Sequence, residues 1–134
     1  MRFNKLIPEL SVSDFQRSLV FYTNVLGFKV EYFREKFTFL SLNGSQIMIE
    51  EINNNWKVAE LEHPFGRWIN FQIEIKNIDK LVQSLKNNNY SLFKDIKDNR
   101  YRKGNKLFGC REFLIQDPDW YLLRFSQNIW TKNV

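Results

Sequence analysis

The order of secondary-structure elements predicted for the first half of this chain returns in the second half, about 65 residues later. In the first half, the hydrophobic pattern predicts a strand, a helix and three strands, over Lys5–Val12, Asp14–Leu26, Phe28–Phe33, Phe37–Leu42 and Ser45–Ile52. In the second half it predicts the same order, over Trp68–Lys76, a short helix from Ile78 to Leu85, Ser91–Ile96, Arg111–Gln116 and Trp120–Ser126. A chain of 134 residues with this repeat is predicted to form one α+β domain built from two βαβββ modules.

Local signals agree with these elements. Ser13 and Gln16 form a capping-box pattern at the start of the first helix, and Gly27 suits the position just past its end. Asn43-Gly44 predicts a tight hairpin turn, and Asp117-Pro118-Asp119 predicts a turn between the last two strands. The first module therefore spans about residues 1–55 and the second about 66–130 of a single domain, 1–134, and we expect their curved mixed sheets to surround a cleft.

The positive charge of the chain belongs to its second half. The whole chain has 20 basic and 15 acidic side chains, but residues 1–65 carry 7 basic and 8 acidic ones, whereas residues 66–134 carry 13 and 7. Residues 94–111 alone hold seven basic side chains against Asp95 and Asp98, a local charge of +5. A concentration of this kind favours an anionic partner.

Several classes of protein are excluded or disfavoured by composition. No apolar run approaches the ~20 residues that a bilayer span requires, and the N-terminus lacks the apolar core of a signal peptide, so we expect a cytoplasmic protein. Cys110 is the only cysteine and His63 the only histidine, which excludes an intrachain disulfide and the common zinc ligand sets. We expect a structural role for both residues.

Four stretches carry family-like motifs: Pro8–Asp14, Ser18–Phe28 with its Phe-Tyr and Leu-Gly-Phe, Gly66–Ile75, and Asp117–Phe125. Together they resemble the vicinal oxygen chelate superfamily, which groups glyoxalases, ring-cleaving dioxygenases and bleomycin-resistance proteins. The resemblance covers essentially the whole chain and implies the fold of paired βαβββ modules predicted above.

The resemblance also implies four positions that line the cleft, which fall on Ile7, Glu50, Asn70 and Arg124. Metal-dependent members of the superfamily hold histidine, glutamate or glutamine there. Only Glu50 is a good ligand for a divalent cation, and an arginine would repel one. We therefore expect no metal and no other cofactor, and we expect Arg124 to fill the space of the metal and to pair with Glu50.

The metal-free branch that the chain most resembles is the bleomycin-resistance group, whose members bind an antibiotic without altering it, in a groove between two subunits. For this chain the resemblance implies a homodimer that sequesters a planar antibiotic or metabolite, with Pro8 as a hinge through which the first strand crosses to the partner subunit. Candidate ligand-binding residues are aromatic side chains outside the expected core and polar ones on the cleft strands: Glu50, Trp56, Phe65, Trp68, Asn70, Gln72, Tyr101, Phe108, Arg111 and Arg124.

The sign of the ligand's charge follows from residues 94–111, which the resemblance implies is a loop beside the groove. Its excess of Lys and Arg would repel a cationic drug such as bleomycin. A basic loop next to an aromatic cleft instead favours an anionic or carbonyl-rich small molecule.

Two other functions stay open. The protein is an enzyme if Glu50 acts as a general base on a substrate held by Asn70 and Gln72. It is a nucleic-acid binder if Lys97–Arg111 contacts phosphates while Tyr101 and Phe108 stack on bases, although a solvated basic loop is the favoured interpretation of that segment.

Overall fold

The computed structural model describes residues 1–134 and contains two four-stranded mixed sheets, one from each half of the chain. The first half forms β1 (Glu9–Val12), α1 (Phe15–Val20), the π-helical turn η1 (Phe21–Val25), β2 (Lys29–Arg34), β3 (Phe37–Leu42) and β4 (Ser45–Glu51). The second half forms β5 (Asn70–Glu74), α2 (Ile78–Asn87), β6 (Lys94–Lys103), β7 (Lys106–Gln116) and β8 (Leu122–Asn133).

The two sheets have the same topology. The strand orders are β1-β4-β3-β2 and β5-β8-β7-β6, with a parallel first pair in each sheet and antiparallel pairs elsewhere. This confirms the α+β fold of two similar βαβββ modules predicted from the repeat.

The first helix begins at Asp14, whose side chain accepts a hydrogen bond from the backbone nitrogen of Arg17 at 3.1 Å. The predicted capping role of Ser13 is wrong, because the Ser13 side chain bonds to Asp119 of the second module instead. The helix ends in the π-helical turn η1, in which the backbone nitrogen of Leu26 bonds to the carbonyl of Phe21, five residues earlier. It stops at Gly27, whose φ of 89° suits glycine.

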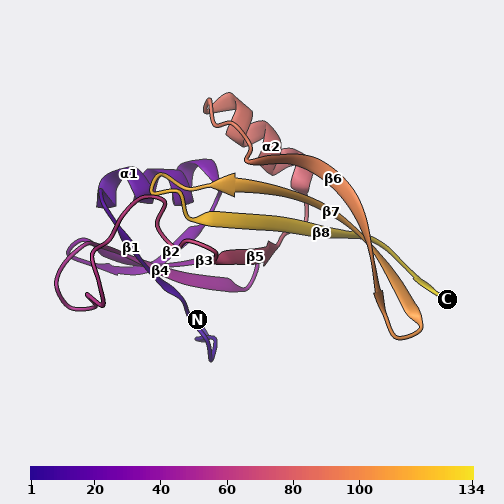
Figure 1. Cartoon of the computed structure of the whole chain (residues 1–134), viewed down its shortest axis with the longest axis horizontal. Helices are drawn as coiled ribbons and strands as arrows, with labels where there is room; N and C mark the ends of the chain where they lie inside the picture. Colours follow the sequence, from indigo (N-terminus) through magenta and orange to yellow (C-terminus); the bar gives the residue numbers. More distant parts are fainter.

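The helices of both modules cover one face of the two sheets and lie against each other (Figure 1). Ser84 of α2 donates a hydrogen bond to the carbonyl of Val25 at 2.7 Å, across the boundary between the modules. Both modules contribute to one buried apolar cluster, which includes Phe21, Ile49 and Phe125. Burying each such side chain contributes about 1.5–3 kcal/mol, so neither helix is expected to be stable without the other.

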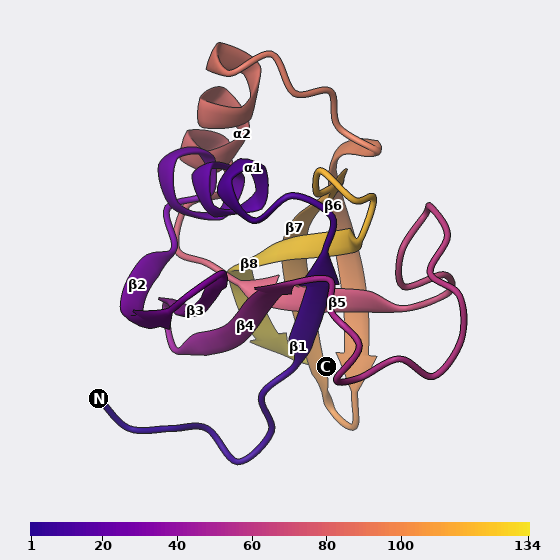
Figure 2. The same cartoon turned by 90° about the vertical axis from the view of Figure 1, so that its left-hand side faces the viewer.

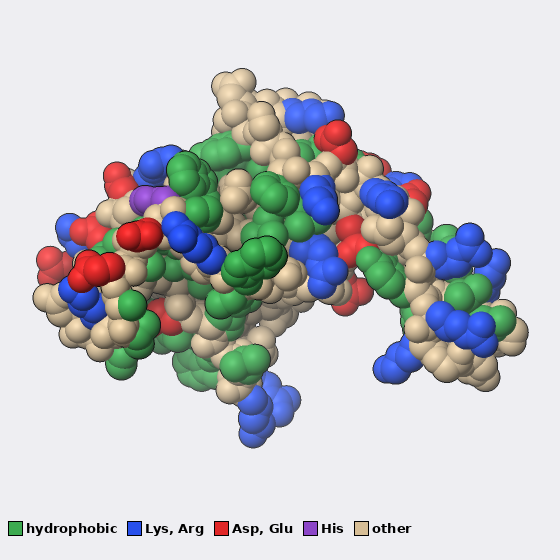
Figure 3. Space-filling view, viewed as in Figure 1, with side chains coloured by type: hydrophobic (Ala, Val, Ile, Leu, Met, Phe, Trp, Pro, Cys, Tyr) green, Lys and Arg blue, Asp and Glu red, His purple; other side chains and the backbone are tan.

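The opposite face of each sheet is not covered by a helix, and we call these two surfaces the open faces. Along β4 and β8 the buried residues Ile49 and Phe125 alternate with Glu50 and Arg124, which therefore point toward the open faces. Viewed in space-filling form, the underside of the molecule is hollowed between the N-terminal segment and the ends of the longest strands (Figure 3).

Beyond α2, the strands β6, β7 and β8 continue as a three-stranded arm, residues 99–110 and 128–133, which projects from the body of the molecule (Figure 1). The expectation that residues 94–111 form a loop is therefore wrong. Almost all of β6 is exposed, so its residues show no apolar face, and the period-two signal of a strand is absent from the sequence. The same reason explains why β7 and β8 extend beyond the predicted Arg111–Gln116 and Trp120–Ser126.

The first strand begins at Glu9, later than the predicted Lys5, and the residues before it pack on their own chain. The backbone nitrogen of Asn4 bonds to the Gln46 side chain at 2.7 Å, and the Phe3 ring meets the edge of Phe39 with 5.3 Å between the ring centres. No helix in the structure is long and apolar enough to cross a membrane.

Candidate functional site

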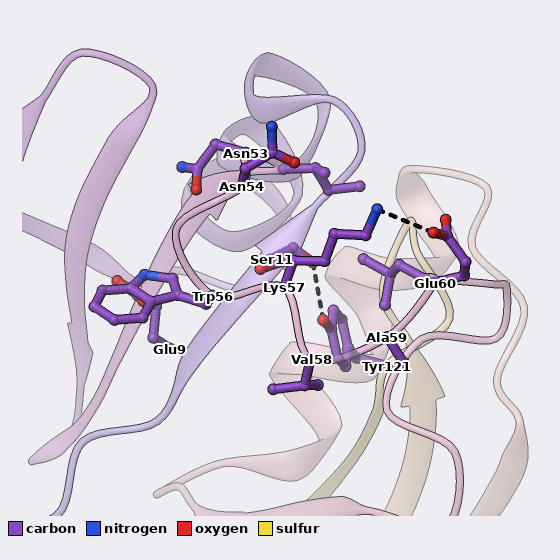
Figure 4. A pocket seen from close by; sticks show the side chains of 12 residues that line it. Glu9, Ser11, Asn53, Asn54, Trp56, Lys57, Val58, Ala59, Glu60 and Tyr121 are labelled. Carbon is purple, nitrogen blue, oxygen red and sulfur yellow. Dashed lines mark hydrogen bonds and ion pairs between the residues drawn. The ribbon is translucent and has the colours of Figure 1, made fainter.

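A cavity of about 410 Å³ lies between β1 and the loop that joins the modules, residues 52–69 (Figure 4). Figure 2 shows the path of this loop from β4 to β5. Its walls come from three parts of the chain. Glu9 and Ser11 come from β1, Tyr121 comes from the turn before β8, and Trp56 is among the residues that the loop contributes. We call it the loop cavity.

Hydrogen bonds hold these walls together. The Tyr121 hydroxyl donates to the carbonyl of Ser11 at 2.8 Å, which fixes the second module against β1 (Figure 4). At the start of the loop, Asn53 donates to the Glu50 carboxylate at 2.6 Å. Trp56 itself stays two-thirds exposed, so one large aromatic ring is available to a ligand.

Two carboxylates lie close together on the open face of the first sheet. Because β1 and β4 are parallel, with Ser11 opposite Glu50, the side chains of Glu9 and Glu50 point to the same face. Burial and the neighbouring negative charge of Glu50 raise the pKa of Glu9, and Arg34 offsets this in part. Neither carboxylate takes part in an ion pair, so both are free to accept hydrogen bonds from a ligand.

A second cavity, of about 660 Å³, lies on the open face of the second sheet and along the inner side of the arm. Its lining is mixed, with aromatic, amide, hydroxyl and charged groups, from Gln72, Glu74, Tyr101, Arg102, Lys103, Phe108, Cys110, Ser126, Asn128 and Thr131. We call it the arm cavity.

The centre of this face is the buried carboxylate of Glu112, which is only 5% exposed. It accepts hydrogen bonds from the Tyr101 hydroxyl and from the Asn99 side chain, and the Arg124 guanidinium lies 3.9 Å away. The hydrogen bond to Glu112 raises the pKa of Tyr101, so this phenol keeps its proton. Arg124 also donates to the Gln72 side chain at 2.8 Å.

The expected ion pair between Arg124 and Glu50 is therefore wrong within one chain. The two residues lie on different sheets, and Arg124 is neutralised by Glu112. Alternation along one strand predicts the face on which a residue lies, but it does not predict which residue of the neighbouring strand lies beside it.

Of the ten ligand-binding candidates, Trp56 lies in the loop cavity, Glu50 lies beside Glu9, and Gln72, Tyr101 and Phe108 line the arm cavity. Arg124 is part of the network beneath the arm cavity. Trp68 and Asn70 are exposed near the start of β5 and line neither cavity.

Two of the candidates lie elsewhere. Phe65 is 3% exposed and packs in the core, with its ring stacked on His63, so it is not a groove wall. Arg111 lies on the helix side of its sheet, where it pairs with Asp98 at 2.8 Å and Asp79 at 3.3 Å. The structure places neither side chain at a cavity, because loop position does not reveal burial and the register of β6 is not evident from the sequence.

Glu9, Ser11, Tyr121 and Glu112 are site residues that the sequence argument missed. The signal for Glu9 was available, since it lies on a strand next to the one that carries Glu50. No signal indicated Glu112, because a glutamate in an alternating strand is normally solvated.

The four cleft positions implied by the resemblance do not form one cluster in the chain. Glu50 belongs to the first sheet, whereas Asn70 and Arg124 belong to the second. No group of three or more His, Cys, Asp or Glu side chains lies close enough together to hold a metal ion. The residues present can instead stack on planar groups and exchange hydrogen bonds with them.

The family model described as the Glyoxalase/Bleomycin resistance protein/Dioxygenase superfamily matches residues 4–125. The chain belongs to this superfamily.

Among individual proteins, the chain is similar to the bleomycin resistance proteins of Geobacillus stearothermophilus and Staphylococcus aureus. Each is 28% identical over 137 aligned positions, which cover 92% of this chain and 96% of the relative. The fold is shared with TioX from Micromonospora sp. ML1, with a TM-score of 0.74 and 14% identity over 95% of this chain and all of that one. It is also shared with a virulence protein from Salmonella typhimurium, with a TM-score of 0.69 and 20% identity over 96% of this chain and all of that one.

Proposed function

We propose that the protein binds a planar small molecule without metal and without altering it, on the open faces of its sheets. The observation that carries this proposal is the exposed Trp56 ring, which lines the same cavity as the unpaired carboxylate of Glu9. The similarity to bleomycin resistance proteins supports it. Sequestration of an antibiotic or metabolite is the role that we infer, and the cytoplasmic location expected from the sequence stays a prediction.

The charge of the loop cavity leads us to revise the proposed ligand. The anionic ligand was inferred from a basic loop beside the groove, but residues 94–111 form the arm, and Arg111 faces the helix side. At the loop cavity, Lys57 is paired with Glu60 at 2.9 Å, whereas Glu9 and Glu50 are free of ion pairs. We infer a ligand whose planar group stacks on Trp56 and whose amine or amide groups donate to Glu9 and Glu50.

We further propose a homodimer in which the open face of each subunit meets the partner. The loop cavity and the arm cavity are lined by different residues, and the underside of the single chain is hollowed (Figure 3). Light scattering coupled to gel filtration should give twice the 16.3 kDa chain mass. Exchange of the first strand at Pro8 stays a prediction, because residues 2–4 bond to their own chain here.

The test of binding uses metal-free bleomycin, followed by tryptophan fluorescence and by the shift in melting temperature. A ligand that binds only the folded state raises the melting temperature. We expect Trp56→Ala to weaken binding about tenfold, consistent with the loss of one aromatic stack. The matched control is Trp68→Ala, which removes a fully exposed indole outside the cavity and should leave binding unchanged. Equal loss in both variants, or no binding to the wild type, would contradict the proposal.

An enzymatic function is the second candidate, because the raised pKa of Glu9 beside Glu50 suits a general base. Chromatography of the ligand after incubation with sub-stoichiometric protein separates the two functions. Recovery of unchanged ligand supports binding alone. A product that disappears with Glu50→Gln, while binding persists, would establish the enzyme.

A further inference from the structure

The helix-side face of the arm, opposite the open face, carries an aromatic ring laid on the backbone. Trp130 of β8 pairs with Gly109 of β7, and a Cβ built on Gly109 would lie 2.2 Å from two ring atoms of Trp130. Only glycine permits this approach, so the indole lies directly on the strand with its other face turned outward. Trp130 is 38% exposed.

Two cations flank this ring. Arg100 and Trp130 both lie opposite Gly109, and Lys132 follows Trp130 by two residues on β8, so both cations share the face that carries Trp130. The ammonium nitrogen of Lys132 is 5.3 Å from the ring centre. A cavity of about 480 Å³ lies at this place, lined by Asp98, Asn99, Arg100, Ile129, Trp130 and Lys132.

The positive charge of this surface is not neutralised within the chain. Arg100 and Lys132 form no ion pair, and the nearby Asp98 is already bonded to Arg111 by two hydrogen bonds, at 2.8 and 3.2 Å. Lys and Arg side chains also gather around the end of the arm in the space-filling view (Figure 3). The surface therefore attracts anions, and it offers an aromatic face in the middle of the cations.

We propose that this face binds single-stranded nucleic acid, with a base stacked on Trp130 and the flanking phosphates held by Arg100 and Lys132. The combination of an aromatic platform and a cationic groove is what such binding requires, since each stacked base and each neutralised phosphate adds affinity. A duplex keeps its bases stacked internally and offers none to the ring. A lipid surface would favour an aromatic side chain that projects outward, whereas this indole lies flat on Gly109.

The proposal is independent of the proposed small-molecule site, because that site lies at β1 and the joining loop, whereas Trp130 lies on the arm of the second sheet. It also differs from the nucleic-acid interpretation of the sequence, which used Tyr101 and Phe108. Both of those residues line the arm cavity on the open face.

The test is fluorescence anisotropy of a labelled oligothymidylate of about 12 nucleotides, at about 50 mM and about 200 mM salt. We expect binding that weakens with salt and that Trp130→Ala weakens about tenfold. Replacing Arg100 and Lys132 by Gln should weaken binding and reduce the salt dependence. Trp56→Ala is the control that should bind the oligonucleotide like the wild type, and circular dichroism checks that each variant is folded.

Gly109→Ala gives a second measurement that keeps the tryptophan, because the added methyl group displaces the indole from the strand. It should weaken oligonucleotide binding and leave metal-free bleomycin binding unchanged. The proposal is overturned if the wild type does not bind at about 50 mM salt, if Trp130→Ala binds as tightly as the wild type, or if a duplex of equal length binds equally well. Binding to phosphatidylserine vesicles that requires Trp130, without binding to the oligonucleotide, would also overturn it.

Discussion

The hydroxyl of Tyr22 donates a hydrogen bond to the Asp117 carboxylate at 2.7 Å, in a fully buried contact between residues 95 positions apart. The other Asp117 oxygen accepts the backbone N–H groups of Asp119 and Tyr121, each at 2.9 Å. The turn before β8 is thereby fixed to the first helix, so the same turn that supplies Tyr121 to the loop cavity also joins the modules.

Tyr22→Phe should lower the free energy of unfolding by about 2 kcal/mol, because it leaves a buried carboxylate with one hydrogen bond fewer. Urea denaturation measures the change. Tyr90→Phe is the matched control, since the Tyr90 hydroxyl makes no hydrogen bond within the chain, and it should stay within about 0.5 kcal/mol of the wild type. Similar losses in both variants would show that the Tyr22 bond contributes nothing specific.

Stability should depend on pH through Asp117. Burial raises its pKa to about 6, above the ordinary value of 3.8 that applies in the unfolded chain. The folded state therefore binds this proton more tightly than the unfolded chain does. The stabilisation that results is complete below pH 3.8 and is lost as the pH rises through 6. Between pH 5 and pH 7.5 the free energy of unfolding should fall by about 1.4 kcal/mol from this group.

Urea titrations at those two pH values, in the wild type and in Asp117→Asn, isolate this contribution. The variant cannot release a proton at this position and should show a much smaller difference. An identical pH dependence in both proteins would rule out Asp117 as the source.

Gly66→Ala should destabilise the protein by about 3 kcal/mol and weaken ligand binding. Gly66 has a φ of 67°, and a Cβ there would lie 2.7 Å from the Tyr121 ring, which is a wall of the loop cavity. Gly27→Ala is the control, because Gly27 has a φ of 89° with open space around it and should cost only about 1 kcal/mol. Thermal unfolding measures the change in stability, and titration with metal-free bleomycin measures the change in binding. Equal effects of the two substitutions would contradict this prediction.

His63→Ala should loosen the loop that joins the modules. His63 is 2.9 Å from the buried Asp119 carboxylate, which also accepts the backbone N–H of Ser13 at 2.8 Å. Without the imidazole, trypsin should cut faster after Lys57, with a loss of global stability of only about 1 kcal/mol. Unchanged cleavage at Lys57 would mean that Phe65 alone holds the loop.

Much of the fold could be predicted because its signals are local. The helix that ends at Gly27, the Asn43-Gly44 turn and the repeated order of elements follow from spacing and from backbone preferences. The arm could not be predicted, since strands with two solvated faces carry no apolar period.

The site was predicted less completely, because its chemistry depends on pairing between strands. Trp56 and Gln72 could be chosen by residue type and position, but Glu112 beneath Arg124 required the register of β7 against β8. Likewise, Asp117 and Asp119 look like ordinary turn residues in the sequence, and only the packing of the modules makes them buried acceptors.

The way in which the joining loop is attached has a consequence for how this protein can diversify. One anchor is the bond from Asn53 to Glu50, and the other is His63 with Phe65, while residues 54–61 between them carry most of the loop cavity wall and stay outside the core. Those eight positions can be replaced together while both anchors stay intact. New ligand specificities are therefore accessible by substitution, insertion or loop grafting at little expense to folding, much as antigen-binding loops vary on a constant framework.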